Sequence, residues 1–191
     1  MNSLIGVTPV PWSSLLPYRY VIGFGHALII CGTLIWIPSN SDRLITMGFL
    51  SALLILSLFD CLQGLIYDRL LLPLTVLGLV ASYLDGMSMA DLVSGAITGG
   101  GFLYLLRFVT QGGLGLGDVK FGGVLGIWLG LSGIIPALFF AFLFGGLTAL
   151  FFLFRHHRGH DTLPFGPFLS LGALTVFFAG EEILAVYGSF L

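Results

Sequence analysis

The chain has 191 residues, of which 57% are hydrophobic and only 8% are charged. Soluble domains carry roughly a quarter charged residues, so this composition excludes the soluble classes and predicts an integral membrane protein in contact with the lipid bilayer. The formal net charge of -2 and the lack of a basic cluster interleaved with aromatic residues exclude nucleic acid as an expected partner.

A membrane-spanning helix needs about 20 mainly apolar residues, and about seven stretches of the chain approach this length. The sequence therefore predicts an all-α fold: a bundle of about six to seven transmembrane helices, forming a single domain over residues 1–191. The third and fifth stretches are short. In chain order the expected spans are Tyr20 to Ile37, Leu44 to Ile66, Leu70 to Tyr83, Ala90 to Thr110, Val119 to Leu131, Ile134 to Phe154 and Phe165 to Ala185.

The basic residues predict how these spans are oriented, because short cytoplasmic loops retain Lys and Arg. No basic residue precedes Arg19 and no small-residue cleavage site follows the first apolar run, so this run is expected to stay in the cytoplasmic (inner) membrane rather than to be removed. With the N-terminus inside, Arg43 is the only basic residue outside. The six on the cytoplasmic side are Arg19, Arg69, Arg107, Lys120, Arg155 and Arg158.

Two carboxylates stand out: Asp60 lies late in the second expected span, and Asp118 stands at the start of the fifth, directly before Val119. A carboxylate in a membrane helix costs about 2.5–3.5 kcal/mol on insertion scales, so it indicates a partner or a function. The orientation places both acids toward the cytoplasmic face. Two facing carboxylates can share one proton, and such a pair can activate water and polarise a peptide carbonyl, as aspartic proteases do. The alternative is that each acid only binds backbone groups or a nearby Arg at a helix end.

Asp118 follows a glycine-rich run, Gly112-Gly-Leu-Gly-Leu-Gly. Glycines here remove side chains where a substrate or a neighbouring helix must come close, and they permit backbone angles closed to other residues. A phosphate-binding loop does not fit, because no Gly-Lys-Ser/Thr follows and no strand precedes. After the acid, Gly122, Gly126 and Gly130 recur at every fourth residue. This spacing predicts a smooth helix face that packs closely against a partner helix.

Three blocks of the sequence, in this order and spacing, resemble the type IV prepilin peptidases of the GxGD aspartyl protease class. The resemblance extends from about Ala52 to Gly180. The blocks are Phe59-Asp-Cys-Leu-Gln-Gly-Leu-Ile-Tyr-Asp-Arg-Leu-Leu-Leu-Pro-Leu, Gly115-Leu-Gly-Asp-Val-Lys-Phe and Leu163-Pro-Phe-Gly-Pro-Phe-Leu-Ser-Leu-Gly.

Carried over by position, the resemblance implies that Asp60 and Asp118 are the catalytic acids. Gly115 and Gly117 match the glycines of the motif, and Asp68 and Lys120 match further positions that support the active site. Pro164-Phe-Gly-Pro resembles a helix start of the family and is interpreted as structural, since proline is tolerated in a first helical turn.

The resemblance also implies an aspartic-type endopeptidase that removes the basic leader of prepilins or pseudopilins at the cytoplasmic membrane face, in type IV pilus or type II secretion biogenesis. No metal and no organic cofactor are implied. Many such enzymes carry a cysteine-rich insertion that accompanies N-methylation. Here Cys31 and Cys61 form no CxxC pair, and the connector from Pro38 to Arg43 is too short for that insertion. The sequence therefore predicts a short form with peptidase activity, in which both cysteines are inert packing residues.

Two other functions fit parts of the sequence. A GxGD protease of the presenilin or signal peptide peptidase type is suggested by Tyr67-Asp68 and Pro136-Ala-Leu, and it would make Asp68 the first catalytic acid. Against it, Pro136 follows Asp118 by only 18 positions. A proton-coupled transporter would use Asp60 and Asp118 as ion sites, although both acids lie toward one face and no inverted repeat is visible.

The histidines do not indicate a metal site. His26 lies in an apolar span and is interpreted as a packed, hydrogen-bonded residue. His156, His157 and His160 lie beside two arginines and are interpreted as a solvated connector.

Overall fold

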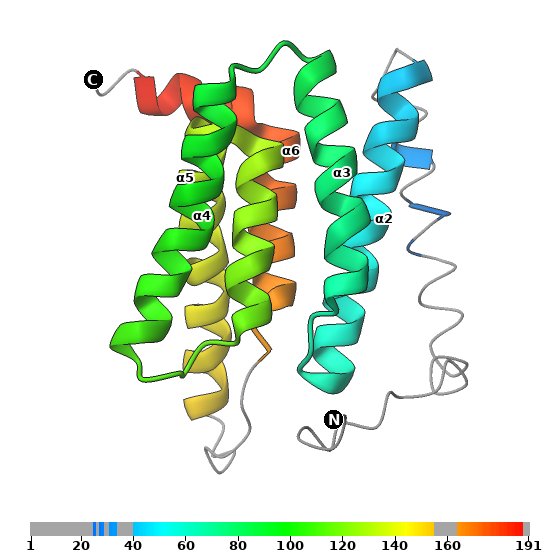
Figure 1. Cartoon of the computed structure of the whole chain (residues 1–191). Coiled ribbons are helices and arrows are strands. Elements are labelled where there is room, and N and C mark those ends of the chain that lie inside the picture. The colour runs from blue at the N-terminus through cyan, green and yellow to red at the C-terminus, as the bar shows by residue number, and fades with distance from the viewer. Residues whose placement is uncertain (1–24, 26, 29–30, 34–39, 155–163, 189–191) are drawn as a thin grey trace, which may run out of the picture.

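The structure is a computed structural model that describes residues 25, 27–28, 31–33, 40–154 and 164–188. From residue 40 onward the described chain forms helices and no strand, as Figure 1 shows. An all-α membrane protein is therefore confirmed. The helices are α2 (Asn40–Gln63), α3 (Asp68–Leu84), α4 (Met89–Val109), α5 (Leu116–Phe154) and α6 (Gly166–Gly188).

The helices match the predicted spans closely. Leu44–Gln63, Met89–Val109 and Leu116–Phe154 are each long and apolar enough to cross a membrane, and α3 is shorter at 17 residues. The first predicted span, Tyr20 to Ile37, lies largely outside the described residues, as do His26 and the histidine connector.

Helix α5 is two antiparallel helices that meet at Gly130, where the backbone leaves helical geometry (φ 64°, ψ -175°). A methyl group built on Gly99 of α4 would touch both the Gly122 carbonyl and the Ile134 side chain. In a straight helix those two residues would be about 18 Å apart, so the chain must reverse between them. Figure 1 shows the first half rising beside α4 and the second half descending behind it. Val119 to Leu131 and Ile134 to Phe154 are thus confirmed as separate helices.

Side chains of neighbouring helices form hydrogen bonds with the backbone groups that are left without helical partners at this reversal. The Asp91 carboxylate of α4 accepts a hydrogen bond from the Leu131 backbone N–H at 3.0 Å, where the second half of α5 begins. A negative charge is favoured at a helix N-terminus. The Ile127 carbonyl would normally accept from Leu131, and it accepts instead from the Ser82 hydroxyl at 2.9 Å. The hairpin is therefore fixed by α3 and α4 together.

The predicted glycine face of α5 packs against glycines of α4. A methyl group on Gly95 would overlap the Gly126 carbonyl, and one on Gly99 would overlap the Gly122 carbonyl. Helix backbones that approach this closely require small residues on both sides. The prediction from the glycine spacing is confirmed, and α4 is the partner helix.

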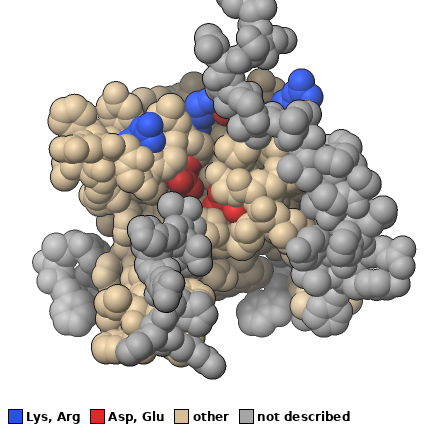
Figure 2. Space-filling view, turned by 90° about the horizontal axis from the view of Figure 1, so that it is seen from below, with Lys and Arg blue, Asp and Glu red and all other residues tan. Residues whose placement is uncertain are grey.

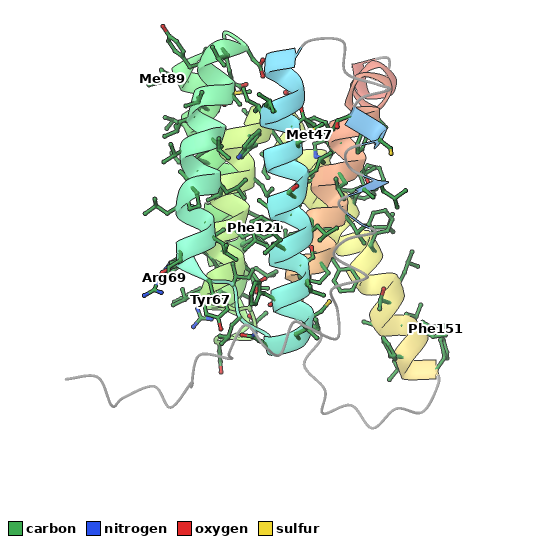
Figure 3. All side chains as sticks on the ribbon, turned by 90° about the vertical axis from the view of Figure 1, so that its right-hand side faces the viewer. Met47, Tyr67, Arg69, Met89, Phe121 and Phe151 are labelled. Atoms are coloured by element: carbon green, nitrogen blue, oxygen red, sulfur yellow. The ribbon has the colours of Figure 1, made fainter. Side chains whose placement is uncertain are left out.

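An aromatic and aliphatic core joins these helices to α2, α3 and α6. The rings of Phe49 and Trp128 stack with centroids 4.3 Å apart, and the Trp128 indole N–H donates to the Leu74 carbonyl at 2.9 Å. Figure 3 shows Phe121 pointing into the middle of the bundle, where it is fully buried. The other large, fully buried side chains are Phe49, Leu53, Leu56, Leu74, Leu103, Leu125, Ile134 and Leu169.

Candidate active site

The lower end of the bundle in Figure 1 is where α2 and α4 end and where α3, α5 and α6 begin. Asp60 lies there in the last turn of α2, with 4% of its surface exposed. Its Oδ2 accepts a hydrogen bond from the backbone N–H of Gly166, the first residue of α6, at 2.7 Å. Asp60 thus caps α6, where a carboxylate interacts favourably with the positive end of the helix dipole.

Asp118 lies in the first turn of α5, with 8% of its surface exposed. Gly115 packs against its carboxylate, since a methyl group built on Gly115 would lie 2.9 Å from Asp118 Oδ2. Asp118 also lies within electrostatic range of Asp60. Within the described part of the chain, Asp118 Oδ1 is buried without a hydrogen-bond partner. The structure therefore brings the two predicted acids together, from helices 58 residues apart along the chain, and leaves one buried oxygen unsatisfied.

The two motif glycines, Gly115 and Gly117, are required by close packing. A methyl group on Gly115 would lie 2.9 Å from Asp118 Oδ2, and one on Gly117 would lie 2.8 Å from the Ile66 side chain in the connector after Asp60. Neither glycine has a positive φ; within the run only Gly112 does (φ 95°). The backbone conformation that only glycine adopts readily is thus found at Gly112. The lack of a side chain at Gly115 makes room for the Asp118 carboxylate, and its lack at Gly117 makes room for Ile66.

Asp68 and Lys120, the two predicted supporting residues, form an ion pair at the same end of the bundle. Lys120 Nζ lies 2.8 and 2.7 Å from the two carboxylate oxygens of Asp68. The pair links the first residue of α3 to the start of α5, and 69% of the Asp68 side chain is exposed. Asp68 is thus a surface carboxylate with a cationic partner, whereas Asp60 is a buried one facing Asp118.

Figure 2 looks at this end of the molecule and shows acidic side chains near its centre, with basic side chains on one side of them. The described basic residues at this end are Arg69, Arg107 and Lys120, which agrees with the grouping predicted from the sequence. Among the described residues, no cluster of three or more His, Cys, Asp or Glu side chains is arranged to hold a metal ion.

An apolar groove of about 570 Å³ is lined by α2, by α6 and by described residues of the first predicted span, and it reaches the candidate site. Cys61 and Pro167, which line one end of it, directly follow Asp60 and Gly166 in the sequence. Cys61 and Cys31 are both exposed, so the prediction that they are packing residues is wrong. The other lining residues are Leu28, Gly32, Thr33, Leu50, Leu53, Leu54, Ser57, Leu58, Ser170, Leu171, Leu174 and Phe178.

Two residues of the site were not assigned a role there from the sequence. Gly166 belongs to the Pro164-Phe-Gly-Pro block, which was interpreted only as a helix start, yet a methyl group on it would lie 2.7 Å from Asp60 Oδ2. The signal was a glycine between two prolines at the beginning of a helix. Arg107 was used only to orient the chain, yet its guanidinium donates a hydrogen bond to the Leu114 carbonyl in the glycine-rich connector.

Comparison with known proteins agrees with this arrangement. The profile of the Type IV leader peptidase family matches residues 47–150. The chain belongs to this family. The matched region runs from α2 through most of α5 and contains Asp60, Asp118 and the glycine motif.

Curated relatives in the family are longer proteins. A prepilin leader peptidase/N-methyltransferase of Xanthomonas campestris pv. campestris is 34% identical over 143 residues, which cover 71% of this chain and 50% of that protein. Proteins with the same name from Burkholderia pseudomallei and Bacillus subtilis are 30% and 33% identical, over 89% and 73% of this chain and 58% and 57% of their own lengths. This chain thus spans about half the length of these relatives. No solved structure matches it.

Proposed function

We propose that this chain is an aspartic endopeptidase of the cytoplasmic membrane that removes the basic leader of prepilins or pseudopilins, with Asp60 and Asp118 as its catalytic pair. The observation that carries the proposal is the burial of these two carboxylates at one end of the bundle, within electrostatic range of each other. A buried charge costs free energy unless it is paired, and two acids placed together are harder still to ionise together. Such an arrangement is expected where the acids perform chemistry.

In the proposed mechanism the pair holds one proton. The ionised carboxylate takes a proton from a water molecule as the water oxygen attacks the scissile carbonyl carbon, and the protonated carboxylate donates its proton to the carbonyl oxygen. The tetrahedral intermediate then collapses: one of its hydroxyls returns its proton to the ionised carboxylate, the C–N bond breaks, and the amine leaves with the proton of the other carboxylate. The pair therefore again holds one proton. The proton belongs to the pair rather than to one named residue. Asp118 Oδ1 is buried without a hydrogen-bond partner among the described residues, so its lone pairs are not committed to another protein group.

The groove between α2 and α6 supports a substrate with an apolar helix. Its lining is nearly all hydrophobic, and its end at Cys61 and Pro167 adjoins the Asp60–Gly166 hydrogen bond. We infer that the apolar segment after the scissile bond of a prepilin lies in this groove. The scissile peptide would then reach the acids while its flanking helix stays out of water.

The proposed cytoplasmic orientation of the site rests on charge. Arg69, Arg107 and Lys120 all lie at the same end of the bundle as the two acids. Short loops rich in Lys and Arg remain on the cytoplasmic side. Roles in type IV pilus or type II secretion biogenesis, and prepilins or pseudopilins as partners, follow from the proposed substrate.

The presenilin-type alternative would make Asp68 the first acid. The burial of Asp60 beside Asp118, against the 69% exposure of Asp68 in its ion pair with Lys120, favours Asp60. The transporter alternative would place the acids deeper in the bilayer, whereas Asp60 and Asp118 lie in the last turn of α2 and the first turn of α5.

The test is co-expression of the chain with a prepilin, followed by the size shift on a gel. Asp60→Asn and Asp118→Asn should each abolish processing, because either change removes one member of the pair. Asp85→Asn, at the opposite end of the bundle beyond α3, is the matched control and should process normally. Complete processing by Asp60→Asn or Asp118→Asn would rule out the proposed pair.

A further inference from the structure

One peptide group connects the Arg107 side chain to the Asp118 carboxylate. Leu114 supplies the carbonyl of this group, and that carbonyl accepts a hydrogen bond from the Arg107 guanidinium. Gly115 follows it and packs against the Asp118 carboxylate, since a methyl group built on Gly115 would lie 2.9 Å from Asp118 Oδ2. The Leu114–Gly115 peptide is therefore held by α4 on one side and lies against the first turn of α5 on the other.

Further hydrogen bonds hold the rest of the connector, and one of them is made by the Arg107 backbone. The Arg107 carbonyl accepts a hydrogen bond from the Gly112 backbone N–H at 2.9 Å, at the position where the chain turns with positive φ. The Thr110 hydroxyl donates to the Leu106 carbonyl at 2.8 Å. At the far end of the connector, the Gly115 carbonyl accepts from Val119 as α5 begins. Arg107 thus holds the connector both through its backbone and through its side chain.

We propose that Arg107 is a positioning residue, which fixes the Leu114–Gly115 peptide where Gly115 packs against the Asp118 carboxylate and so restricts the orientation of that carboxylate. This inference rests on the proposed function. The glycines of the connector have no side chains of their own to hold it, so a side chain from outside must restrict it. A planar guanidinium with several donors in fixed geometry is suited to this task. Arg107 is half-buried against the connector, so it acts through Asp118 and does not itself touch the reacting atoms.

Replacing Arg107 removes a positive charge as well as its hydrogen bond to the connector. A second arginine serves as the control that separates these two effects. Arg69 lies at the same end of the bundle, in the first turn of α3, and it is exposed. Figure 3 shows the Arg69 side chain reaching away from the helices. Replacing Arg69 removes the same charge from the same membrane face without touching the connector.

The experiment uses the purified full chain in detergent or liposomes with a prepilin substrate, and it compares Arg107→Met, Arg107→Lys and Arg69→Met with wild type. Met keeps the apolar stem and removes every donor, whereas Lys keeps the charge and one donor. Because small displacements of a catalytic group can cost up to about 100-fold in rate, we expect kcat to fall at least about tenfold in Arg107→Met. Arg107→Lys should lose about threefold, and Arg69→Met should keep kcat within about twofold. KM should stay within about twofold throughout, because Arg107 does not contact the substrate.

A second measurement does not depend on catalysis. Hydrogen–deuterium exchange should be faster in Arg107→Met for the peptide covering residues 112–118, with Arg107→Lys intermediate and Arg69→Met unchanged. The exchange rates of α2 and of the second half of α5 should stay at their wild-type values.

The outcomes separate this inference from the proposed function. If wild type does not cleave the prepilin, the proposed function is wrong, and the exchange data still show whether Arg107 holds the connector. If wild type cleaves, the inference is overturned by an unchanged kcat in Arg107→Met, or by an equal loss in Arg69→Met. If Arg107→Met does not fold, Arg107→Lys decides: wild-type kcat and exchange in that variant would restrict Arg107 to a role in folding and overturn the inference.

Discussion

The backbone N–H of Gly166 donates a hydrogen bond to Asp60 Oδ2 at 2.7 Å, across 106 positions of the sequence. This bond joins the last turn of α2 to the first residue of α6. It holds Oδ2 of the carboxylate at the start of α6. The start of α6 is therefore part of the candidate site. Position 166 requires glycine because the Asp60 carboxylate lies too close to leave room for a side chain.

Replacing Gly166 tests this relationship. In Gly166→Ala the new methyl group would lie 2.7 Å from Asp60 Oδ2 and 3.1 Å from its Cβ, so either α6 or the carboxylate must move. We expect kcat for prepilin cleavage to fall by about tenfold or more, because the two acids are displaced from each other. Gly146→Ala is the control, since nothing lies within 4 Å of a methyl group there. Equal kcat in the two variants would contradict the role of Gly166.

The Asp68–Lys120 ion pair is expected to contribute much less to the rate of cleavage than the buried acids Asp60 and Asp118. Both side chains are more than half exposed, and exposed ion pairs contribute about 0–1 kcal/mol. Asp68→Asn and Lys120→Gln should therefore each lower kcat/KM by no more than about fivefold. The double variant should resemble either single one, since both changes break the same contact.

This comparison also decides between Asp60 and Asp68 as the first catalytic acid. The measurement is the steady-state rate of each variant beside Asp60→Asn on one prepilin. Complete loss of cleavage in Asp68→Asn, together with activity in Asp60→Asn, would favour the presenilin-type assignment.

Much of the site could be predicted because its signals are local. The positions of Lys and Arg placed Asp60 and Asp118 at one end of the bundle, and the glycine spacing after Asp118 predicted a closely packed helix face. These patterns are readable because they depend on composition within one or two helices.

The remainder depends on contacts between distant segments, which leave no local pattern. Nothing near Asp91 in the sequence indicates that it binds the Leu131 backbone, 40 positions away. Likewise, the sequence around Arg107 does not distinguish it from any other arginine at the end of a membrane helix. Only the path of the connector shows that its side chain reaches Leu114. The cysteines were wrongly predicted to be packing residues, because an apolar run in the sequence does not show which side of a helix packs against the rest of the protein.

The contact between α4 and α5 should be sensitive to single methyl groups. A methyl group on Gly99 would overlap the Gly122 backbone, whereas one on Gly101, in the same helix, would meet only the Ile97 side chain at 3.9 Å. We expect Gly99→Ala to destabilise the protein by about 1–3 kcal/mol, as overpacking does. Gly101→Ala should be neutral or slightly stabilising, because alanine favours helix. Thermal unfolding in detergent measures both, and equal stability of the two variants would refute the close packing of these backbones.

The proposed groove predicts a defect that depends on the length of the substrate. Ser57 lines the groove one turn before Cys61, so Ser57→Trp would fill the space that the apolar helix of a prepilin is proposed to occupy. We expect KM for full-length prepilin to rise by about tenfold, the cost of about 1.4 kcal/mol of lost binding. A short peptide that ends a few residues after the scissile bond should be cleaved at the wild-type rate, because it does not reach the groove.

Leu72→Trp is the matched control for this groove variant, since Leu72 is 69% exposed on α3 and does not line the groove. It adds the same indole ring to the apolar surface at another place, and both substrates should be cleaved as by wild type. If Ser57→Trp slows both substrates equally, the ring has disturbed Asp60 itself, and the groove is not where the helix binds. If KM for full-length prepilin rises equally in both tryptophan variants, the effect comes from the altered apolar surface in general. Only a selective loss of full-length substrate in Ser57→Trp agrees with a helix lying between α2 and α6 beside the two acids.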